Sequence, residues 1–568
     1  MYQKKTISTK FIGCIFVFTL LLLAVPLHAA VFYVSTSGTR SSGASTAGDW
    51  SNANCYGTIS AAIQRMSGGD EVVVNDGVYT GVNNVIGRYN SFSVPSGTSS
   101  KYTVIRARNP FQATIDSGQS SAWNYYGMMI YIPSGGSYIH VDGFKGINRD
   151  GSNNTFVGIV GNHIKITRCM FRTQGSANNE NCVVSVTGGA SYVLFEDCAL
   201  TGGYRYGFIV RGVSSAPNHI IFRRCVARGD WVQSSEPNSI FAVYGHNSSA
   251  ASGPNNIMFQ NCIAIDQNAS VPDADWKPYG PWYIFKGNRD ITLDGCITLA
   301  NDQTGSTSGS WIRNDYGGKN IDVVNSVFWG FKGIGTIFAG NTANIRNCTF
   351  GGNTTSYSLV NYASPSTFKN NLVIRSSKGT LYGSAFGTAS YNSFDSGAFG
   401  SSQVAYRNDL LYLPRIESSS NRINGGEGGS KVGAHIMYRM GRSGSLWGES
   451  GWNTQTTEAI WPWPHEDKIR EWFRASNTPP AGSSPSSNNT LRGFCADGET
   501  LTTYIWEYLG RTIPSDIYSG QGGTDPDPPD DPPIDPPTDP PTDPPTDPPT
   551  GPDTVPPAKP TGVKAAQQ

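Results

Sequence analysis

The sequence predicts an all-β solenoid, in which short parallel strands are wound into successive coils. Three observations lead to this fold class. A strand-like phrase that ends in a small residue recurs along the middle of the chain, the segments between its copies leave no room for helices, and only 15% of the residues are charged. The low charge also argues against helical bundles and coiled coils.

The first 30 residues have the pattern of a secretory signal peptide. Lys4, Lys5 and Lys10 precede an apolar run from Phe11 to about Leu27, and the small pair Ala29-Ala30 follows. We therefore expect the mature chain to begin near Val31 and to be exported, either secreted or held at the cell surface. No other stretch has the roughly 18 apolar residues that a membrane span requires, so we expect no transmembrane segment.

The repeated phrase has six residues, with an apolar residue at the first and third positions and a small residue at the sixth. Its copies are Ile164–Cys169, Val193–Cys198, Ile220–Cys225, Ile257–Cys262, Ile291–Cys296, Ile321–Ser326, Ala343–Cys348 and Ser366–Asn371. Their spacing ranges from 22 residues (Ser326 to Cys348) to 37 residues (Cys225 to Cys262), as in solenoid repeats. Stacking the copies places the sixth residues in one internal column, so we expect these cysteines to be reduced packing residues.

One residue in each phrase must bend the chain, because the inward-facing set resumes three positions after the third residue instead of two. The bend residue is Gly or Asn in most copies, and both tolerate a positive φ. These positions are Asn261, Gly295, Asn325, Asn347 and Asn370, with Arg168 and Arg224 as departures.

A second strand recurs in each coil, at Val184–Thr187, Phe208–Arg211, Phe241–Tyr244, Tyr283–Lys286, Ser310–Arg313 and Leu359–Asn361. The order strand, bend, strand, loop, strand, turn resembles the right-handed parallel β-helix of the pectate-lyase-like superfamily over roughly residues 70–400. We assign residues 31–400 to this β-helix. Thr58 precedes a helical face containing Ile59, Ile63 and Met66, which predicts a helical cap over the first coil.

The remaining chain divides into three parts. Residues 401–523 are predicted to form a small packed cap region, with short helices at about 465–475 and 501–509. Its segments Trp461-Pro-Trp-Pro464, Arg492–Ala496 and Leu501–Gly510 resemble a C-terminal segment found after β-helices in secreted bacterial proteins. Residues 524–557 are an Asp/Pro/Thr-rich linker, and residues 558–568 resemble the start of a fibronectin type III module.

Candidate catalytic residues come from the second strands, which in register stack Thr187, Arg211, Tyr244, Lys286, Arg313, Ala339 and Asn361. Polysaccharide lyases of the resembled fold remove a proton beside a uronic-acid carboxylate while a cation neutralises that carboxylate. The resemblance implies Lys286 as the base, with Arg211 and Arg313 as carboxylate partners. Tyr244 or His246 would then be the proton shuttle.

Three long loops, 227–239, 266–281 and 299–310, lead into the same strands. Aromatic side chains on and beside them suit sugar rings, and the candidates are Trp231, Trp276, Tyr279, Trp282 and Trp311. Clustered carboxylates suit Ca²⁺, and the candidates are Asp266, Asp273 and Asp275. Such carboxylates would equally serve as the acid and base of a glycoside hydrolase.

The sequence thus favours an exported, monomeric β-helix protein that engages a polysaccharide along its flank, with lyase activity ahead of glycoside hydrolysis if the protein is an enzyme. Equal numbers of basic and acidic residues, 42 of each, argue against a nucleic-acid partner. The alternative is a non-catalytic surface or matrix scaffold that binds carbohydrate. In that case the basic column pairs with loop carboxylates, and loops cover the outward positions Ile209, Ala242, Ile284 and Trp311.

Overall fold

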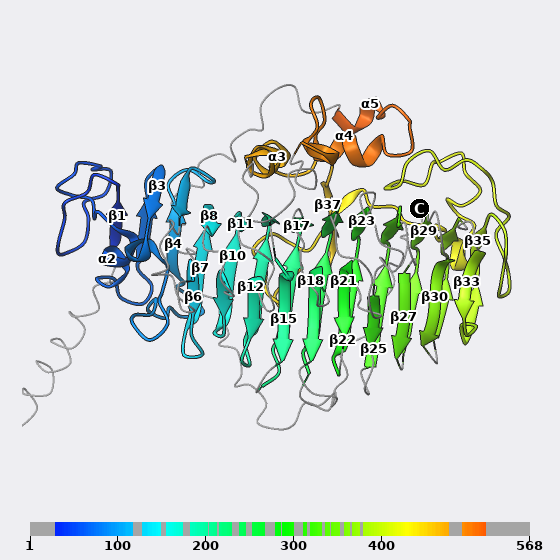
Figure 1. The fold of residues 1–568 in the computed structure, drawn as a ribbon, viewed down its shortest axis with the longest axis horizontal. Helices are drawn as coiled ribbons and strands as arrows, with labels where there is room; N and C mark the ends of the chain where they lie inside the picture. Colours follow the sequence, from blue (N-terminus) through cyan, green and yellow to red (C-terminus); the bar gives the residue numbers. More distant parts are fainter. Residues whose placement is uncertain are drawn as a thin grey trace, which may run out of the picture. The chain divides into compact units, whose positions relative to one another are not determined.

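The computed structural model describes residues 29–116, 128–148, 155–173, 182–202, 204–212, 215–229, 238–245, 253–266, 279–285, 287–299, 311–314, 319–331, 336–340, 342–352, 357–363, 366–374, 379–475 and 491–518 (Figure 1). The predicted signal peptide lies outside the described residues up to position 28, as do the linker and the fibronectin-like start. Within the described part of the chain, no helix is long and apolar enough to cross a membrane.

Three parallel sheets form a right-handed parallel β-helix, which confirms the predicted fold class. Sheet A contains β1 (Val31–Val34), β2 (Glu71–Val74), β4 (Thr103–Ala107), β7 (Ser137–Asp142), β10 (Asn162–Thr167), β13 (Ser191–Glu196), β16 (Asn218–Arg223), β19 (Asn255–Gln260), β22 (Arg289–Asp294), β25 (Lys319–Val324), β28 (Ala343–Arg346), β31 (Ser366–Lys369) and β34 (Thr388–Ser390). Sheet B contains β3 (Gly77–Thr80), β5 (Ala113–Asp116), β8 (Phe144–Asn148), β11 (Met170–Thr173), β14 (Ala199–Gly202), β17 (Val226–Gly229), β20 (Ile263–Ile265), β23 (Ile297–Leu299), β26 (Val327–Trp329), β29 (Thr349–Gly351), β32 (Leu372–Val373) and β35 (Ser393–Phe394). Sheet C contains β6 (Ile130–Ile132), β9 (Val157–Ile159), β12 (Cys182–Thr187), β15 (Tyr206–Gly212), β18 (Asn238–Gly245), β21 (Tyr279–Phe285), β24 (Trp311–Asn314), β27 (Thr336–Gly340), β30 (Tyr357–Ala363) and β33 (Gly379–Gly383).

The predicted bend joins each sheet A strand to the next sheet B strand, and its residue has a positive φ in every described copy. Asn261 has a φ of 51°, and even Arg168 and Arg224 have values of 48° and 50°. The two arginines fit because each donates hydrogen bonds to an aspartate one coil earlier, as from Arg224 Nε to Asp197 Oδ1 at 2.6 Å. Gly295 has a φ of 68°, and an added Cβ there would lie 2.5 Å from Asn261 Nδ2, so a larger residue would displace the Asn261 side chain.

The cysteine column lies inside the solenoid, as predicted. All nine cysteines among the described residues are free thiols and buried. Six of them form the column, and the thiols of Cys198, Cys225, Cys262, Cys296 and Cys348 donate to a backbone carbonyl of the preceding coil, as from Cys262 Sγ to Phe222 O at 3.3 Å. All six column thiols are buried, which fits a packing role, and burial raises the pKa of the Cys169 thiol to about 12.

The N-terminal end is covered as predicted. Helix α2 (Ile59–Ile63) begins after Thr58, whose side chain accepts a hydrogen bond from the Ala61 amide, and its apolar face joins the solenoid core. At the other end, Phe386, Phe394 and Phe399 pack around Phe368 of the last coils. The 3₁₀ turn η1 (Val82–Asn84) follows the first strand of sheet B.

Residues 401–518, here the C-terminal segment, pack along a flank of the solenoid instead of covering its end. This segment contains η3 (Glu427–Gly429), the antiparallel pair β36 (Tyr438–Met440) and β37 (Gln455–Ala459), α3 (Glu466–Arg474), η5 (Gly493–Cys495), α4 (Leu501–Trp506) and α5 (Ser515–Tyr518). Figure 1 shows α3, α4 and α5 beside the strands. Trp461, Trp463, Trp472 and Trp506 are buried in one apolar cluster with outward residues of sheet B.

Residues 427–453, here the strap, follow the line of bends. The side-chain amides of the bend asparagines form hydrogen bonds with the strap backbone. The repeat pattern in the sequence does not predict these hydrogen bonds. His435 N donates to Asn325 Oδ1 at 2.6 Å, and Met440 N donates to Asn261 Oδ1 at 2.6 Å. Asn347 Nδ2 likewise donates to the Lys431 carbonyl. The bend asparagines therefore both turn the chain and hold the strap.

The C-terminal segment packs on the outer faces of two of the three sheets. Beyond sheet B, the strap residue Leu446 packs on Leu194 and Ile221 of sheet A. The apolar cluster on the outer face of sheet C includes no residue of the C-terminal segment. Among the described residues, sheet C is therefore the face left to other chain segments or to a ligand.

Candidate functional site

Strand alternation decides which side chains of sheet C face outward. On β15, β18 and β21 the inward residues belong to the solenoid core: Phe208, Val210, Phe241, Val243, Trp282 and Ile284. The outward residues are Ile209, Arg211, Ala242, Tyr244, Tyr283 and Phe285. They form the central part of the candidate site.

The predicted basic column is correct at Arg211 and Tyr244 and wrong at the next strand. Arg211 pairs with Tyr244, but Tyr244 pairs with Phe285, not with Lys286. Because Trp282 and Ile284 face the core, alternation turns Phe285 outward, and a shift of one residue would reverse every side chain of the strand. Lys286 itself lies outside the described residues, as does His246.

The column resumes as predicted on β24, where the backbone of Arg313 pairs with Ala339. The side chain of Arg313 lies outside the described residues. On β30 the partner of Ala339 is Tyr362, not the predicted Asn361, whose side chain is buried. The observed register therefore differs from the predicted one by one residue on β21 and by one residue on β30.

Four aromatic side chains lie on this face, Tyr206, Tyr244, Tyr283 and Phe285, and only Tyr244 is among the candidates predicted from the sequence. Tyr283 lies 6.4 Å from Tyr206, 6.3 Å from Tyr244 and 5.1 Å from Phe285 between ring centroids, with the ring planes near parallel. Burial raises the pKa of Tyr206 far above its ordinary value, so its hydroxyl stays protonated. Strict alternation around Trp282 would have identified Tyr283 and Phe285.

Exposure differs across the face. Ile209 and Ala242 are 1% exposed and Tyr283 is 4% exposed, so the middle of the face is buried. Arg211, Tyr244 and Phe285, which lie two residues further along their strands, are half-buried. On β15, β18 and β21, access to a ligand is therefore greater along the Arg211–Tyr244–Phe285 column than at Ile209, Ala242 and Tyr283.

Trp282 is not a ligand-binding residue, contrary to the prediction. It is fully buried, stacks on Phe241 with ring centroids 4.6 Å apart, and donates from Nε1 to Thr298 Oγ1 at 2.7 Å. The register pairs it with Phe241 and so places it in the aromatic column of the core. The other aromatic candidates cannot be placed against a ligand: Trp231 and Trp276 lie outside the described residues, as do the side chains of Tyr279 and Trp311.

Asp266 is also misplaced by the prediction. It follows β20 and is fully buried beneath the C-terminal segment, where its Oδ1 accepts from the Tyr504 hydroxyl at 3.0 Å and its carbonyl accepts from Arg492. It therefore faces the sheet B side and not the predicted groove. Asp273 and Asp275 lie outside the described residues. Within the part of the chain that the structure describes, no three His, Cys, Asp or Glu side chains gather as a metal site would require.

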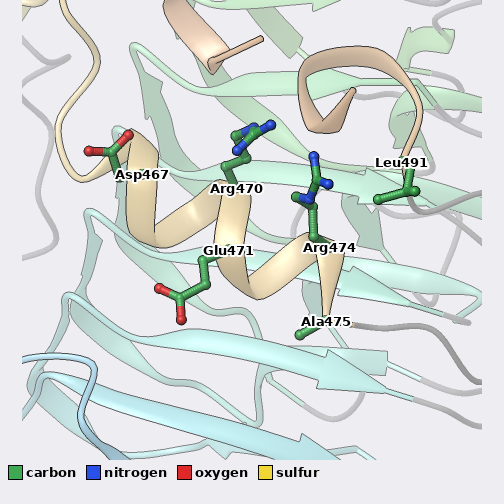
Figure 2. Close-up of a pocket in the computed structure, with 6 residues that line it drawn as sticks. All are labelled: Asp467, Arg470, Glu471, Arg474, Ala475 and Leu491. Carbon is green, nitrogen blue, oxygen red and sulfur yellow. The ribbon is translucent and has the colours of Figure 1, made fainter. Parts of the chain in front are cut away.

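A shallow hollow lies beside α3, lined by Asp467, Arg470, Glu471, Arg474, Ala475 and Leu491. Figure 2 shows Arg470 and Arg474 extending to the same side of the helix. Both are committed to the neighbouring turn, since Arg470 Nη2 donates to Ala496 O and Arg474 Nη1 donates to Cys495 O, at 2.8 and 2.7 Å. This hollow is a solvated helix face that holds the turn in place.

Comparisons with known proteins give structural likenesses only. No family model matches the sequence, and no curated protein matches it. Pectate lyase Pel9A is 17% identical, with 71% of this chain and 95% of that chain covered and a TM-score of 0.42. A rhamnogalacturonan lyase is 15% identical, with 63% and 83% covered and a TM-score of 0.37. The A-module of the Azotobacter vinelandii mannuronan C-5 epimerase AlgE6 is 12% identical, with 58% and 92% covered and a TM-score of 0.34.

Proposed function

We propose that the chain binds an acidic polysaccharide on the outer face of sheet C and cleaves it by β-elimination. The observation that carries the proposal is the pairing of Arg211 with Tyr244 beside the rings of Tyr283 and Phe285, on the face that the C-terminal segment leaves uncovered. A guanidinium binds a carboxylate strongly and with defined geometry. Aromatic rings suit the apolar faces of sugars, so the pair fits a uronic-acid residue better than a neutral one.

The proposed reaction uses the groups that the column offers. A base, proposed to be Lys286, takes the proton from C5 of the sugar, and the electron pair forms a double bond between C4 and C5. The C4–O4 bond then breaks, and Tyr244, or alternatively His246, gives a proton to O4. Arg211 and Arg313 stabilise the negative charge that develops on the carboxylate.

Calcium is not needed in this scheme. The described residues do not fit a Ca²⁺ site, because Asp266 is held by Tyr504 on the other side of the solenoid. We therefore assign no step to a metal ion. Addition of Ca²⁺ or a chelator remains a useful arm of the test, because Asp273 and Asp275 are still proposed ligands.

Binding without catalysis is the second candidate function, and the burial of Ile209 and Ala242 favours it. A closed central face would admit a polysaccharide only along its edge. Arg211 would then anchor the carboxylate of a bound sugar, and no bond would break. The protein would serve as a rigid carbohydrate-binding scaffold.

The test is to incubate the full chain with polygalacturonate, alginate and hyaluronan, with Ca²⁺ or chelator, and to follow the ultraviolet absorbance of unsaturated product. Arg211→Ala should abolish product formation, and Tyr244→Phe should lower kcat by about 10²-fold or more with binding retained. Arg346→Ala is the matched control, because Arg346 faces outward from sheet A, away from the column. Binding without any product would establish the scaffold, and new reducing ends without unsaturation would establish a hydrolase.

A further inference from the structure

The backbone register defines a second column that crosses sheet C beside the Arg211 column. It takes one residue from each of the ten strands: Tyr131, Gly158, Ser185, Ile209, Ala242, Tyr283, Trp311, Ile337, Val360 and Tyr382. The column contains no charged residue. A tyrosine stands at each end, on β6 and on β33.

Each terminal tyrosine is paired with a second tyrosine. Tyr131 and Tyr89 have ring centroids 5.4 Å apart at an interplanar angle of 70°, and Tyr357 and Tyr382 have centroids 5.2 Å apart at 40°. Both pairs form open angles between rings instead of closed stacks. They are also more exposed than the middle of the column, since Tyr382 is 52% exposed and Tyr89 is 36% exposed.

The two pairs and the Arg211 column share one face of one sheet. Nine strand-to-strand steps separate β6 from β33, which at about 4.8 Å per step gives about 43 Å between the terminal tyrosines. Between them, among the side chains that the structure describes, Arg211, Tyr244 and Phe285 are half-buried and lie side by side on neighbouring strands. An occupant that meets all three places must be long, must lie across the strands, and must combine apolar faces with negative charge.

We propose that the Tyr89–Tyr131 pair and the Tyr357–Tyr382 pair are outer sugar-binding subsites at the two ends of sheet C. The ligand is then a long acidic polysaccharide chain that spans the sheet and is held at its middle by Arg211. This inference rests on the proposed function and specifies the ligand as a long chain. It predicts that affinity rises with chain length beyond what the central residues alone can contact.

Binding is measured by calorimetry with long polygalacturonate and with its trisaccharide, which is too short to span about 43 Å. Tyr131→Ala and Tyr382→Ala should each weaken binding of the long polymer about fivefold to tenfold and leave the trisaccharide unchanged. Tyr131→Phe and Tyr382→Phe should bind normally, because the ring is kept. Tyr438→Ala is the matched control, since Tyr438 is 45% exposed on β36 of the strap.

The outcomes separate this inference from the proposed function. Binding of both ligands with equal affinity, or full binding of the long polymer by the alanine variants, would overturn the outer subsites and leave the central site standing. If the wild-type chain binds none of the long polygalacturonate, its trisaccharide and alginate, both proposals are overturned.

Discussion

Removing the Arg223 side chain is expected to release the strap from the solenoid. Arg223 is fully buried at the end of β16. Its guanidinium donates to Glu196 Oε2 and Gln260 Oε1, both at 2.7 Å, and to three strap carbonyls, those of Arg442, Ser445 and Trp452. One side chain thus joins two coils of the solenoid to both ends of a strap loop.

The size of the effect follows from what Arg223→Ala leaves behind. The Glu196 carboxylate is only 5% exposed, and breaking a buried ion pair costs about 3–5 kcal/mol. Arg224 and the Gly444 amide still contact Glu196, so the lower end, about 3 kcal/mol, is expected. The strap lies at the surface, where water can reach its carbonyls once it lifts. The loss should therefore appear as local opening, with the opening equilibrium raised roughly 100-fold.

Hydrogen exchange followed by mass spectrometry measures this directly. In Arg223→Ala, amides of residues 441–453 should exchange roughly 100-fold faster, and those of β25 and β28 should be unchanged. Arg346→Ala is the control, because Arg346 and Asp322 are partly exposed and 3.9 Å apart, a surface pair worth about 1 kcal/mol at most. Wild-type exchange of the strap in Arg223→Ala would refute the view that this arginine holds it.

Three further predictions concern titrating groups. Burial raises the pKa of Asp294 to about 6; Arg346 opposes this shift and Asp322 adds to it. The protonated carboxyl therefore stabilises the folded chain fully at low pH, and this stabilisation is lost as the pH rises through 6. Asp294→Asn should therefore raise the melting temperature at pH 7 and not at about pH 4; no gain at pH 7 would contradict this. Burial, with the nearby cationic residues Lys431 and Arg415, lowers the pKa of His435 to about 4. The free energy of unfolding should therefore fall as the pH is lowered from about 6.5 to 4, and His435→Gln should flatten that fall. The thiols of the cysteine column should resist iodoacetamide until the chain is denatured. Burial raises the thiol pKa values of Cys169 and Cys348 to about 12, so rapid labelling of either in the native chain would contradict this prediction.

The fold could be predicted from the sequence because each coil repeats its own local signals. The bend at Asn261 and the buried Cys262 next to it can be predicted from a few neighbouring residues, and the same pattern recurs in the other coils. Helix α3 was predicted for the same reason, because Ile469, Trp472 and Phe473 mark one helical face. Periodic patterns of this kind specify the side of an element that is buried.

The site was harder to predict because an error of one residue in the register of a strand exchanges its inward and outward side chains. The predicted second strand Tyr283–Lys286 puts Lys286 in the column by register, whereas Trp282 and Ile284 mark the inward side of β21 and so turn Phe285 outward. The prediction for Trp282 rests on its aromatic ring and on its place beside the 266–281 loop, and neither feature shows which side of β21 it faces. The hydrophobic alternation of the strand would have corrected both errors.

The strap could not be predicted, because its contacts are made by backbone atoms far away in the sequence. The Asn325 side chain bonds to the amide and carbonyl of His435, 110 residues later, and a backbone group leaves no mark on residue type. Asp266 was misplaced for a related reason, since its partner Tyr504 is 238 residues away. Contacts of this range need the folded chain.

The central claim is that sheet C carries the ligand-binding face, and differential hydrogen exchange of the full chain with and without long polygalacturonate or alginate tests it most directly. Bound polymer should slow exchange in β15, β18 and β21, protect β6 and β33 more weakly, and leave β25 and β28 unprotected. Protection confined to the strap or to the strands of sheet A would contradict the claim. So would unchanged exchange in sheet C at polymer concentrations where calorimetry shows binding.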